Sequence, residues 1–258
     1  MKRLMLLLLL ACSLNSAHAG RVCDTKKMSA SNFIAAMNLA DKTRATLDAS
    51  GAQVAIVSRV GQDLSRYGLR YSHMAWVWRD PASARWTVVH ELNQCGTANS
   101  ALYRQGLGNF FLDDMFAYEA DVFIPAPSTQ KKIATMLGSY LPLRLHEARY
   151  NMLAYAFATD YQNSNQWVLE TYAAGVSELQ IGDRGQAQAW LKLAGYRPIT
   201  VSVPAGARLG ARLFSANIAF DDHPFGRRAA GMFDTVTVES VLQFLRAREG
   251  TGQEVVVR

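Results

Sequence analysis

The sequence predicts an α+β fold, and three observations support this class. Two strand-like segments joined by a short turn, residues 71–79 and 85–93, begin an antiparallel meander. Other segments carry the apolar spacing of amphipathic helices. Half of the 258 residues are hydrophobic and 19% are charged, which is typical of a globular protein with a sizeable core. We therefore expect helices packed on a small antiparallel sheet.

The first expected element is an amphipathic helix at residues 29–48. Ser29 or Ser31 is a suitable N-cap, because a serine hydroxyl accepts hydrogen bonds from the free amides of a first turn. The side chains expected on its apolar face are Phe33, Met37, Ala40 and Leu47.

Three strands are expected next, at residues 54–60, 71–79 and 85–93. The Asp-Pro-Ala-Ser sequence at 80–83 has the composition of a tight turn between the last two strands. Residues 94–119 are rich in glycine, asparagine and aromatic residues and are expected to form a long loop. Such a loop often lines a site, although a loop strapped to the surface is an equal alternative.

The C-terminal half is expected to be mainly helical. The expected elements are a strand at 122–125, helices at 128–137, 143–158, 164–174 and 186–194, short strands within 199–238 and a last helix at 240–248. Ser164 or Asn163 is expected to cap one of these helices, and Gly195 to follow the end of another. Residues 249–252 are expected to be frayed. No repeat or linker is visible, so residues 20–258 are expected to form a single domain.

Residues 1–19 have the pattern of a signal peptide. A basic pair precedes an apolar run at 4–10, and Ala-His-Ala at 17–19 fits a signal-peptidase site. The apolar run is shorter than the roughly 20 residues of a spanning helix. A lipoprotein centred on Cys12 is a weaker alternative, because a bulky leucine precedes Ala-Cys there. The expected mature chain is periplasmic or secreted and has no transmembrane segment.

Export would leave Cys23 and Cys95 in an oxidising compartment, where an even pair of cysteines usually forms a disulfide. The bond would attach the mature N-terminus to the loop after the second meander strand. Closing a loop of this length stabilises a protein by on the order of 4 kcal/mol. The alternative is that Cys95 is a free catalytic thiol, which is less favoured because Cys95 follows a strand and caps no helix.

Several classes of function lack their sequence patterns. The net charge is +6, and the basic residues are scattered without the aromatic interleaving that favours nucleic-acid binding. His146-Glu147 lacks the second histidine of a zinc protease helix, and no Cys-x-x-Cys pair occurs. Asp221-Asp222-His223 precedes a proline and is better interpreted as a turn. No metal or other cofactor is therefore expected.

One set of separated residues does suggest chemistry, and it consists of His73, His90 and Ser164. The two histidines lie on strands whose pairing could place them side by side. Ser164 lies at the expected start of a helix, where the helix dipole and free amides favour a nucleophile and stabilise an oxyanion. Acyl transfer needs such a hydroxyl beside a histidine base that a further polar group orients. The alternative is structural, because serine is a common N-cap and strand histidines are often core residues.

The segments around these residues carry a resemblance to a known family. The matching segments are residues 59–64, 71–73, 89–93 and 161–167. The chain resembles the uncharacterised exported bacterial family named domain of unknown function 2145, and the resemblance covers nearly all of the mature chain. It implies no activity.

The two histidine strands are also remotely similar to those of circularly permuted NlpC-type cell-wall endopeptidases, which have a papain-like fold. That resemblance implies that His73 is the base, His90 the orienting residue and Ser164 the counterpart of the cysteine nucleophile. A serine at this position departs from the pattern, since a hydroxyl is far less acidic than a thiol. Three possibilities remain open: an amide or ester hydrolase of the envelope, a non-catalytic periplasmic binding protein, or a cleft that uses groups other than Ser164. Peptidoglycan or another envelope component is the expected partner.

Overall fold

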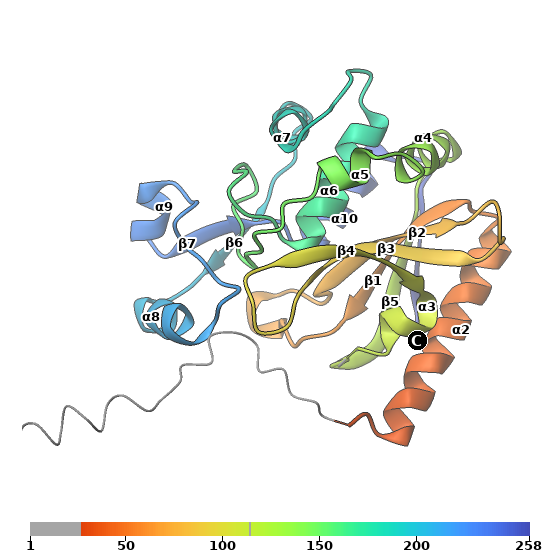
Figure 1. Cartoon of the computed structure of the whole chain (residues 1–258), viewed down its shortest axis with the longest axis horizontal. Coiled ribbons are helices and arrows are strands. Elements are labelled where there is room, and N and C mark those ends of the chain that lie inside the picture. Colours follow the sequence, from red (N-terminus) through yellow and green to blue (C-terminus); the bar gives the residue numbers. More distant parts are fainter. Residues whose placement is uncertain (1–26, 114) are drawn as a thin grey trace, which may run out of the picture.

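The computed structural model describes residues 27–113 and 115–258, and its centre is a six-stranded antiparallel sheet (Figure 1). The strand order is β4-β3-β2-β1-β5-β8. The strands are β1 (Val54–Val60), β2 (His73–Arg79), β3 (Trp86–Asn93), β4 (Ser100–Gly106), β5 (Ala117–Ile124) and β8 (Gln253–Val257). A separate two-stranded sheet pairs β6 (Ile199–Ser202) with β7 (Met232–Thr235). The α+β class predicted from the sequence is confirmed.

Helices cover both faces of the large sheet (Figure 1). The described helices are α2 (Ala30–Ser50), α3 (Leu107–Phe111), α4 (Pro127–Leu137), α5 (Leu141–Arg144), α6 (Ser164–Val176), α7 (Arg184–Leu193), α8 (Ala205–Phe214), α9 (Phe225–Ala229) and α10 (Val238–Arg248), with a 3-10 turn at Ser65–Tyr67. Helices α2 and α3 pack on one face, while α4, α6 and α10 pack on the other. We call these the α3 face and the α6 face.

The alternation of side chains along each strand divides the core between these faces. On β2, Ala75 and Val77 join the apolar cluster of α2 and α3, whereas Met74 and Trp76 join the cluster of α6. Every residue of β1 is buried, since helices cover both of its faces. The direction of a polar side chain on these strands therefore decides whether it lies on the α3 face or on the α6 face.

Several predicted elements are confirmed with small changes of bounds. The first helix is α2, and the Ser29 hydroxyl caps it by accepting a hydrogen bond from the Asn32 amide at 3.1 Å. β1, β2 and β3 form the predicted meander, with Val54 opposite Trp78 and Trp76 opposite Val89. Helices α4, α6, α7 and α10 lie where the sequence predicted them, and Gly195 follows α7 with a φ of +82°.

Other predictions are wrong. The buried face of α2 is formed by Ala36, Leu39, Ala40, Thr43 and Leu47, whereas Phe33 and Met37 are 49% and 37% exposed. The predicted loop at 94–119 contains β4 and α3. Because β4 is an edge strand with largely polar, partly exposed side chains, it lacks the alternation that marks a strand.

Two further errors concern segments whose structure depends on distant partners. The predicted helix at 143–158 ends at Arg144, and the chain then forms turns held by hydrogen bonds to other segments. The stretch at 249–252, expected to be frayed, leads into β8, which pairs with β5. Neither tertiary partner can be read from local sequence.

Export and the disulfide are not decided by the fold. The predicted signal peptide and Cys23 lie outside the described residues, so export and the Cys23–Cys95 bond stay predictions. Cys95 itself lies in the turn between β3 and β4.

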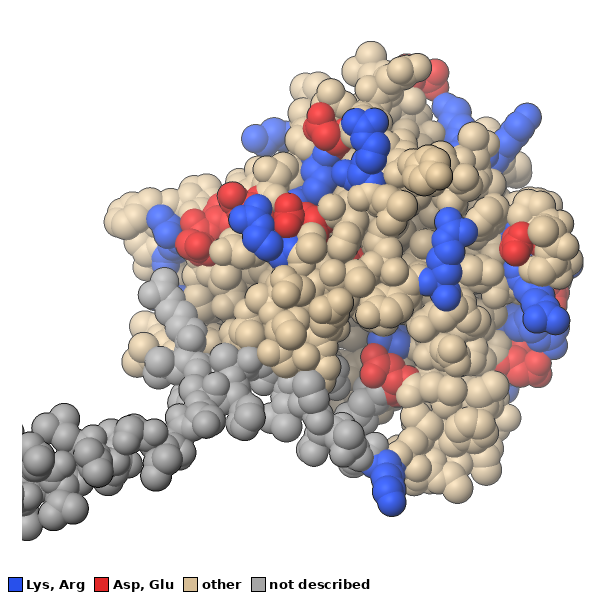
Figure 2. All heavy atoms as spheres, in the orientation of Figure 1, with Lys and Arg blue, Asp and Glu red and all other residues tan. Residues whose placement is uncertain are grey.

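No helix in the described part of the chain has the length and apolar character to cross a membrane. On the face shown in Figure 2, basic side chains are scattered among acidic and uncharged ones.

Candidate functional site

The structure brings the two predicted histidines together. His73 Nε2 lies 2.8 Å from His90 Nδ1, which is hydrogen-bonding distance. The ladder of β2 and β3 runs from the Arg79–Trp86 pair to the Trp76–Val89 pair. His73 and His90 lie just beyond its last pair, so an imidazole contact joins the two strands at this end.

The histidine pair lies on the α3 face beside an aromatic ring and a guanidinium. The Phe110 ring centroid lies 5.7 Å from that of His73 and 5.5 Å from that of His90. The Arg59 guanidinium lies 4.7 Å from the same Phe110 centroid. Arg59 also donates to the Phe110 carbonyl and pairs with Asp113 at 2.5 Å. We call these residues (Arg59, His73, His90, Phe110 and Asp113) the histidine centre.

Both imidazoles are held in the neutral form. Burial lowers the pKa of His73 well below its usual value, and the charges of Arg59 and His90 lower it further. Burial, with Arg59 adding to it, lowers the pKa of His90 to about 3. One neutral ring therefore donates its N–H to the other. His90 Nε2 is buried and has no hydrogen-bond partner.

Ser164 lies on the α6 face, not with the histidines. It is the first residue of α6, and Asn163, not Ser164, caps this helix by accepting from the Gln166 amide at 2.9 Å. Burial raises the pKa of Tyr150 to about 12, and a hydrogen bond with Ser164 opposes part of this shift. The start of α6 does reach β2, since the Asn165 side chain accepts from the Met74 amide at 3.1 Å.

The alternation along β2 explains this separation. Met74 points to α6 with Trp76, so the neighbouring His73 points to Phe110 with Ala75. No hydrogen bond joins Ser164 to His73. The structure thus brings the two histidines into contact on the α3 face, where both are buried, and places Ser164 on the α6 face. The catalytic roles of Ser164, His73 and His90 stay predictions.

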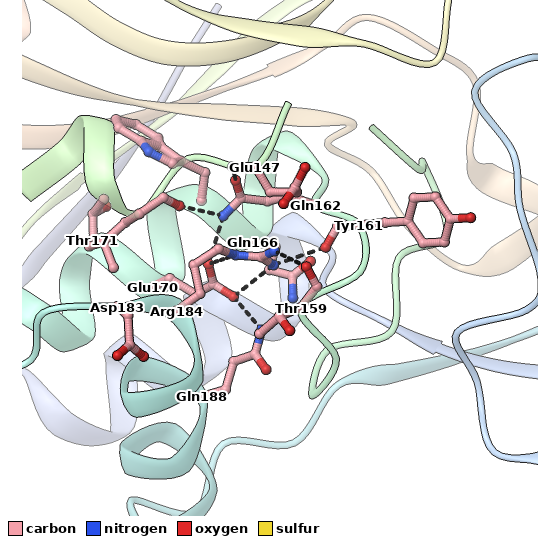
Figure 3. A network of polar contacts seen from close by, with 12 residues as sticks. Glu147, Thr159, Tyr161, Gln162, Gln166, Glu170, Thr171, Asp183, Arg184 and Gln188 are labelled. Atoms are coloured by element: carbon pink, nitrogen blue, oxygen red, sulfur yellow. Dashed lines mark hydrogen bonds and ion pairs between the residues drawn. The ribbon is translucent and has the colours of Figure 1, made fainter. Parts of the chain in front are cut away.

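The α6 face carries a buried polar network that the sequence analysis missed (Figure 3). Glu170 is fully buried and accepts four hydrogen bonds. These come from Arg184 Nε at 2.8 Å and Nη2 at 3.2 Å, Gln162 Nε2 at 2.6 Å and Gln188 Nε2 at 2.7 Å. Burial raises the Glu170 pKa, while Arg184 and the two amides oppose the shift.

Arg184 links this carboxylate to the irregular segment before α6. It donates to the Thr159 carbonyl and the Tyr161 carbonyl, each at 2.9 Å (Figure 3). Gln162 also donates to the Leu145 carbonyl and accepts from the Glu147 amide. The network therefore fixes a segment without regular structure, and its geometry is that of a structural ion pair. The i, i+4 spacing of Arg184 and Gln188 was its one local signal.

Glu91, the residue after His90 on β3, points to the α6 face. It is fully buried, and neither carboxyl oxygen makes a well-formed hydrogen bond. Burial raises its pKa to about 8, although the nearby Ser100 hydroxyl and the charge of Arg184 oppose the shift. A carboxyl group with this pKa is mostly protonated at neutral pH. β3 thus carries a neutral imidazole to one face and a neutral carboxyl to the other.

A second serine and histidine meet near Glu91. Ser100 Oγ lies 3.0 Å from His146 Nε2, and it also lies 3.3 Å from the Glu147 carbonyl and 3.5 Å from the Ala148 carbonyl. The single hydrogen of the hydroxyl can go to a carbonyl or to the imidazole, because the donor of the Ser100–His146 bond depends on the histidine tautomer. Ser100 is 5% exposed.

Together the fold and these contacts define an α+β protein whose sheet carries a buried polar centre on each face. In the described part of the chain, no cluster of three or more histidine, cysteine or acidic side chains could hold a metal ion. The chain belongs to the family of uncharacterised proteins conserved in bacteria called domain of unknown function 2145, whose model matches residues 46–245. No curated protein and no solved structure matches the chain.

The cap of α6 gives a first testable prediction. Asn163→Ala removes the acceptor for the Gln166 amide and the donor to Thr235 Oγ1 at 3.1 Å, so we expect a loss of about 1–2 kcal/mol in unfolding free energy. Ser164→Ala is the matched control, and we expect it to cost less because it loses one hydrogen bond, with Tyr150, whereas Asn163→Ala loses the cap and the bond to Thr235. Urea denaturation of both variants measures the difference. An equal or reversed order would contradict the assignment of Asn163 as the cap.

Proposed function

We propose that this protein is an exported envelope protein that binds its target without cleaving it. The observation that carries the proposal is the position of Ser164, whose hydroxyl contacts Tyr150 on the α6 face while His73 points to the α3 face. A serine nucleophile needs a base within hydrogen-bond reach, and Ser164 has none there.

The histidine centre supports the same conclusion. In the described part of the chain, the only hydrogen bond of His73 or His90 side chains is the one between them. Among the described residues, no serine, threonine or cysteine side chain hydrogen-bonds to either ring. Because Arg59, His90 and Phe110 are buried around His73, a substrate group cannot reach either ring, which favours a protein without catalysis at these histidines.

Export and the envelope target rest on the sequence. The signal-peptide pattern of residues 1–19 supports export. The similarity of the two histidine strands to those of cell-wall endopeptidases supports peptidoglycan as the first target to test. A papain-like ancestry would also explain why the histidine pair is present although a serine occupies the position of the nucleophilic cysteine.

A hydrolase remains the second candidate, because one observation favours it. The 2.8 Å contact lets His90 orient His73, as the third member of a catalytic triad orients the base. In this alternative Ser164 would have to leave Tyr150 and approach His73 from the other face of β2.

Four proteins separate the two candidates: the parent, Ser164→Ala, Ser164→Cys and His73→Ala. We expect all four to hydrolyse activated esters and peptidoglycan fragments at the background rate, and a serine-directed covalent probe to leave Ser164 unlabelled. The cysteine variant is the strictest arm, since a thiolate formed beside a base would react where a hydroxyl does not. Turnover by the parent that is lost in Ser164→Ala would establish the hydrolase and end the binding proposal.

Binding is tested directly with insoluble peptidoglycan. We expect the mature protein, recovered from the periplasmic fraction, to co-sediment with purified sacculi and to release no soluble fragments. Heat-denatured protein is the control for non-specific sedimentation. Failure of the native protein to sediment would remove peptidoglycan as the target.

A further inference from the structure

A groove between α8 and α9 contains positive charge that the protein does not neutralise. It has a volume of about 360 Å³ and is lined by Ala205, Arg208, Leu209, Phe220, Phe225, Arg228 and Ala229. None of these residues comes from the large sheet. The volume lies at the lower end of the range of small-molecule sites.

Two arginines face this groove without an acidic partner. Arg208 donates one hydrogen bond, to the Arg228 carbonyl at 2.6 Å, and the Arg228 side chain donates none. The Nε–H groups of both side chains are buried without an acceptor. Neither forms an ion pair with a described residue. The adjacent Arg227 differs, because it is paired with Asp234 and Thr200.

The unused donors call for an anion. Buried polar groups are nearly always hydrogen-bonded, so guanidiniums with donors that the protein does not use favour a bound acceptor. Arginine guanidiniums match carboxylates, to which they can donate two parallel hydrogen bonds. Two guanidiniums on one groove would hold a single negative group more firmly than a surface cation can.

The rest of the lining is apolar and partly exposed. Leu209 and Phe225 are 62% and 78% exposed, whereas Phe220 is buried and its ring centroid lies 4.8 Å from that of Phe233. Large apolar side chains at an open groove are covered favourably by an apolar ligand group, at roughly 25 cal/mol per Å². The Arg228 guanidinium lies 6.0 Å from the Phe225 ring centroid, so charge and apolar surface adjoin.

We propose that the groove between α8 and α9 binds a carboxylate that carries an aliphatic chain, with Arg208 and Arg228 holding the carboxylate and Leu209 and Phe225 covering the chain. This goes beyond the proposed function, because it places a small-molecule site away from the sheet and does not depend on whether Ser164 is inert.

Octanoate titrated into the mature protein by calorimetry tests the proposal. We expect saturable binding of octanoate, much weaker binding of acetate, which lacks the chain, and none of octylammonium, which reverses the charge. Arg228→Gln should weaken octanoate binding at least about tenfold, because a hydrogen bond to a charged group is lost. Phe225→Ser should also weaken octanoate binding, because the aliphatic chain loses its apolar cover. Phe225 is exposed, so this substitution keeps the fold.

Arg85→Gln is the matched control, because Arg85 is exposed, lies outside the groove and loses the same charge. We expect its octanoate affinity to equal that of the parent. The proposal is overturned if octanoate does not bind, if octylammonium binds equally well, or if Arg228→Gln and Arg85→Gln behave alike. The ester assay on the same preparation tests the proposed function separately. Turnover would refute the proposal of binding without cleavage, and it would not bear on the carboxylate site in the groove.

Discussion

Replacing Arg184 with alanine is expected to lower the free energy of unfolding by about 3–5 kcal/mol, because it leaves the charge of Glu170 buried without its ion partner. Glu170 would keep only its two amide donors, Gln162 and Gln188. The Thr159 and Tyr161 carbonyls would also lose their donor. Urea denaturation of the parent and the variant measures the loss.

A second arginine provides the control for this substitution. Arg44 also contacts two carboxylates, Asp41 and Asp48, each at 2.8 Å, but on the exposed surface of α2. Arg44→Ala should change stability little, since solvent screens such pairs. The loss in Arg184→Ala should also shrink in mild acid, because the isolated Glu170 can then take up a proton. Equal effects of the two substitutions would show that the buried network is dispensable.

Replacing Glu91 with glutamine is expected to stabilise the protein progressively as pH rises. Burial raises the Glu91 pKa from 4.5 to about 8, so the folded protein keeps a proton that the unfolded chain releases. In that pH interval the unfolded state binds fewer protons, and the parent loses stability with each unit of pH. The difference in stability between the variant and the parent is constant below the lower pKa. It reaches its full size above the upper pKa. Glutamine cannot titrate and therefore removes this loss.

Denaturation of the parent and Glu91→Gln at several pH values measures the effect. The stability of the variant relative to the parent should grow by on the order of 3–4 kcal/mol between about pH 5 and about pH 8. Glu178→Gln is the control, because Glu178 is exposed and pairs only with Lys132. A difference that stays constant with pH would mean that Glu91 is ionised in the folded protein.

Local sequence was sufficient wherever an element is defined by its own residues. The meander of β1, β2 and β3 follows from apolar runs and a turn, and Ser29 and Gly195 mark helix ends by their own chemistry. β4 and β8 escaped prediction because edge strands are stabilised by the neighbouring strand and not by a buried face of their own. The segment at 145–163 escaped for a similar reason, since Arg184 fixes it from a distant position in the sequence.

The candidate site shows the same limit at the level of single side chains. The sequence placed His73 and His90 on adjacent strands, which was sufficient to predict their contact. It also placed Ser164 at a helix start near them, and α6 does reach β2 through Asn165. What spacing could not give was the face to which His73 points. That depends on which of two alternating residue sets packs against α6, a property of the assembled core.

The alternation along β3 has a consequence for the alignment of this strand. His90 and Glu91 are consecutive, yet one contacts His73 and Phe110 while the other lies between β3 and α6. A slip of β3 by one residue would exchange them, placing a carboxyl against Phe110 and an imidazole beside Arg184. It would also turn Val88 and Val89 toward the wrong clusters. The polar pair thus reinforces the apolar pattern in specifying a single register.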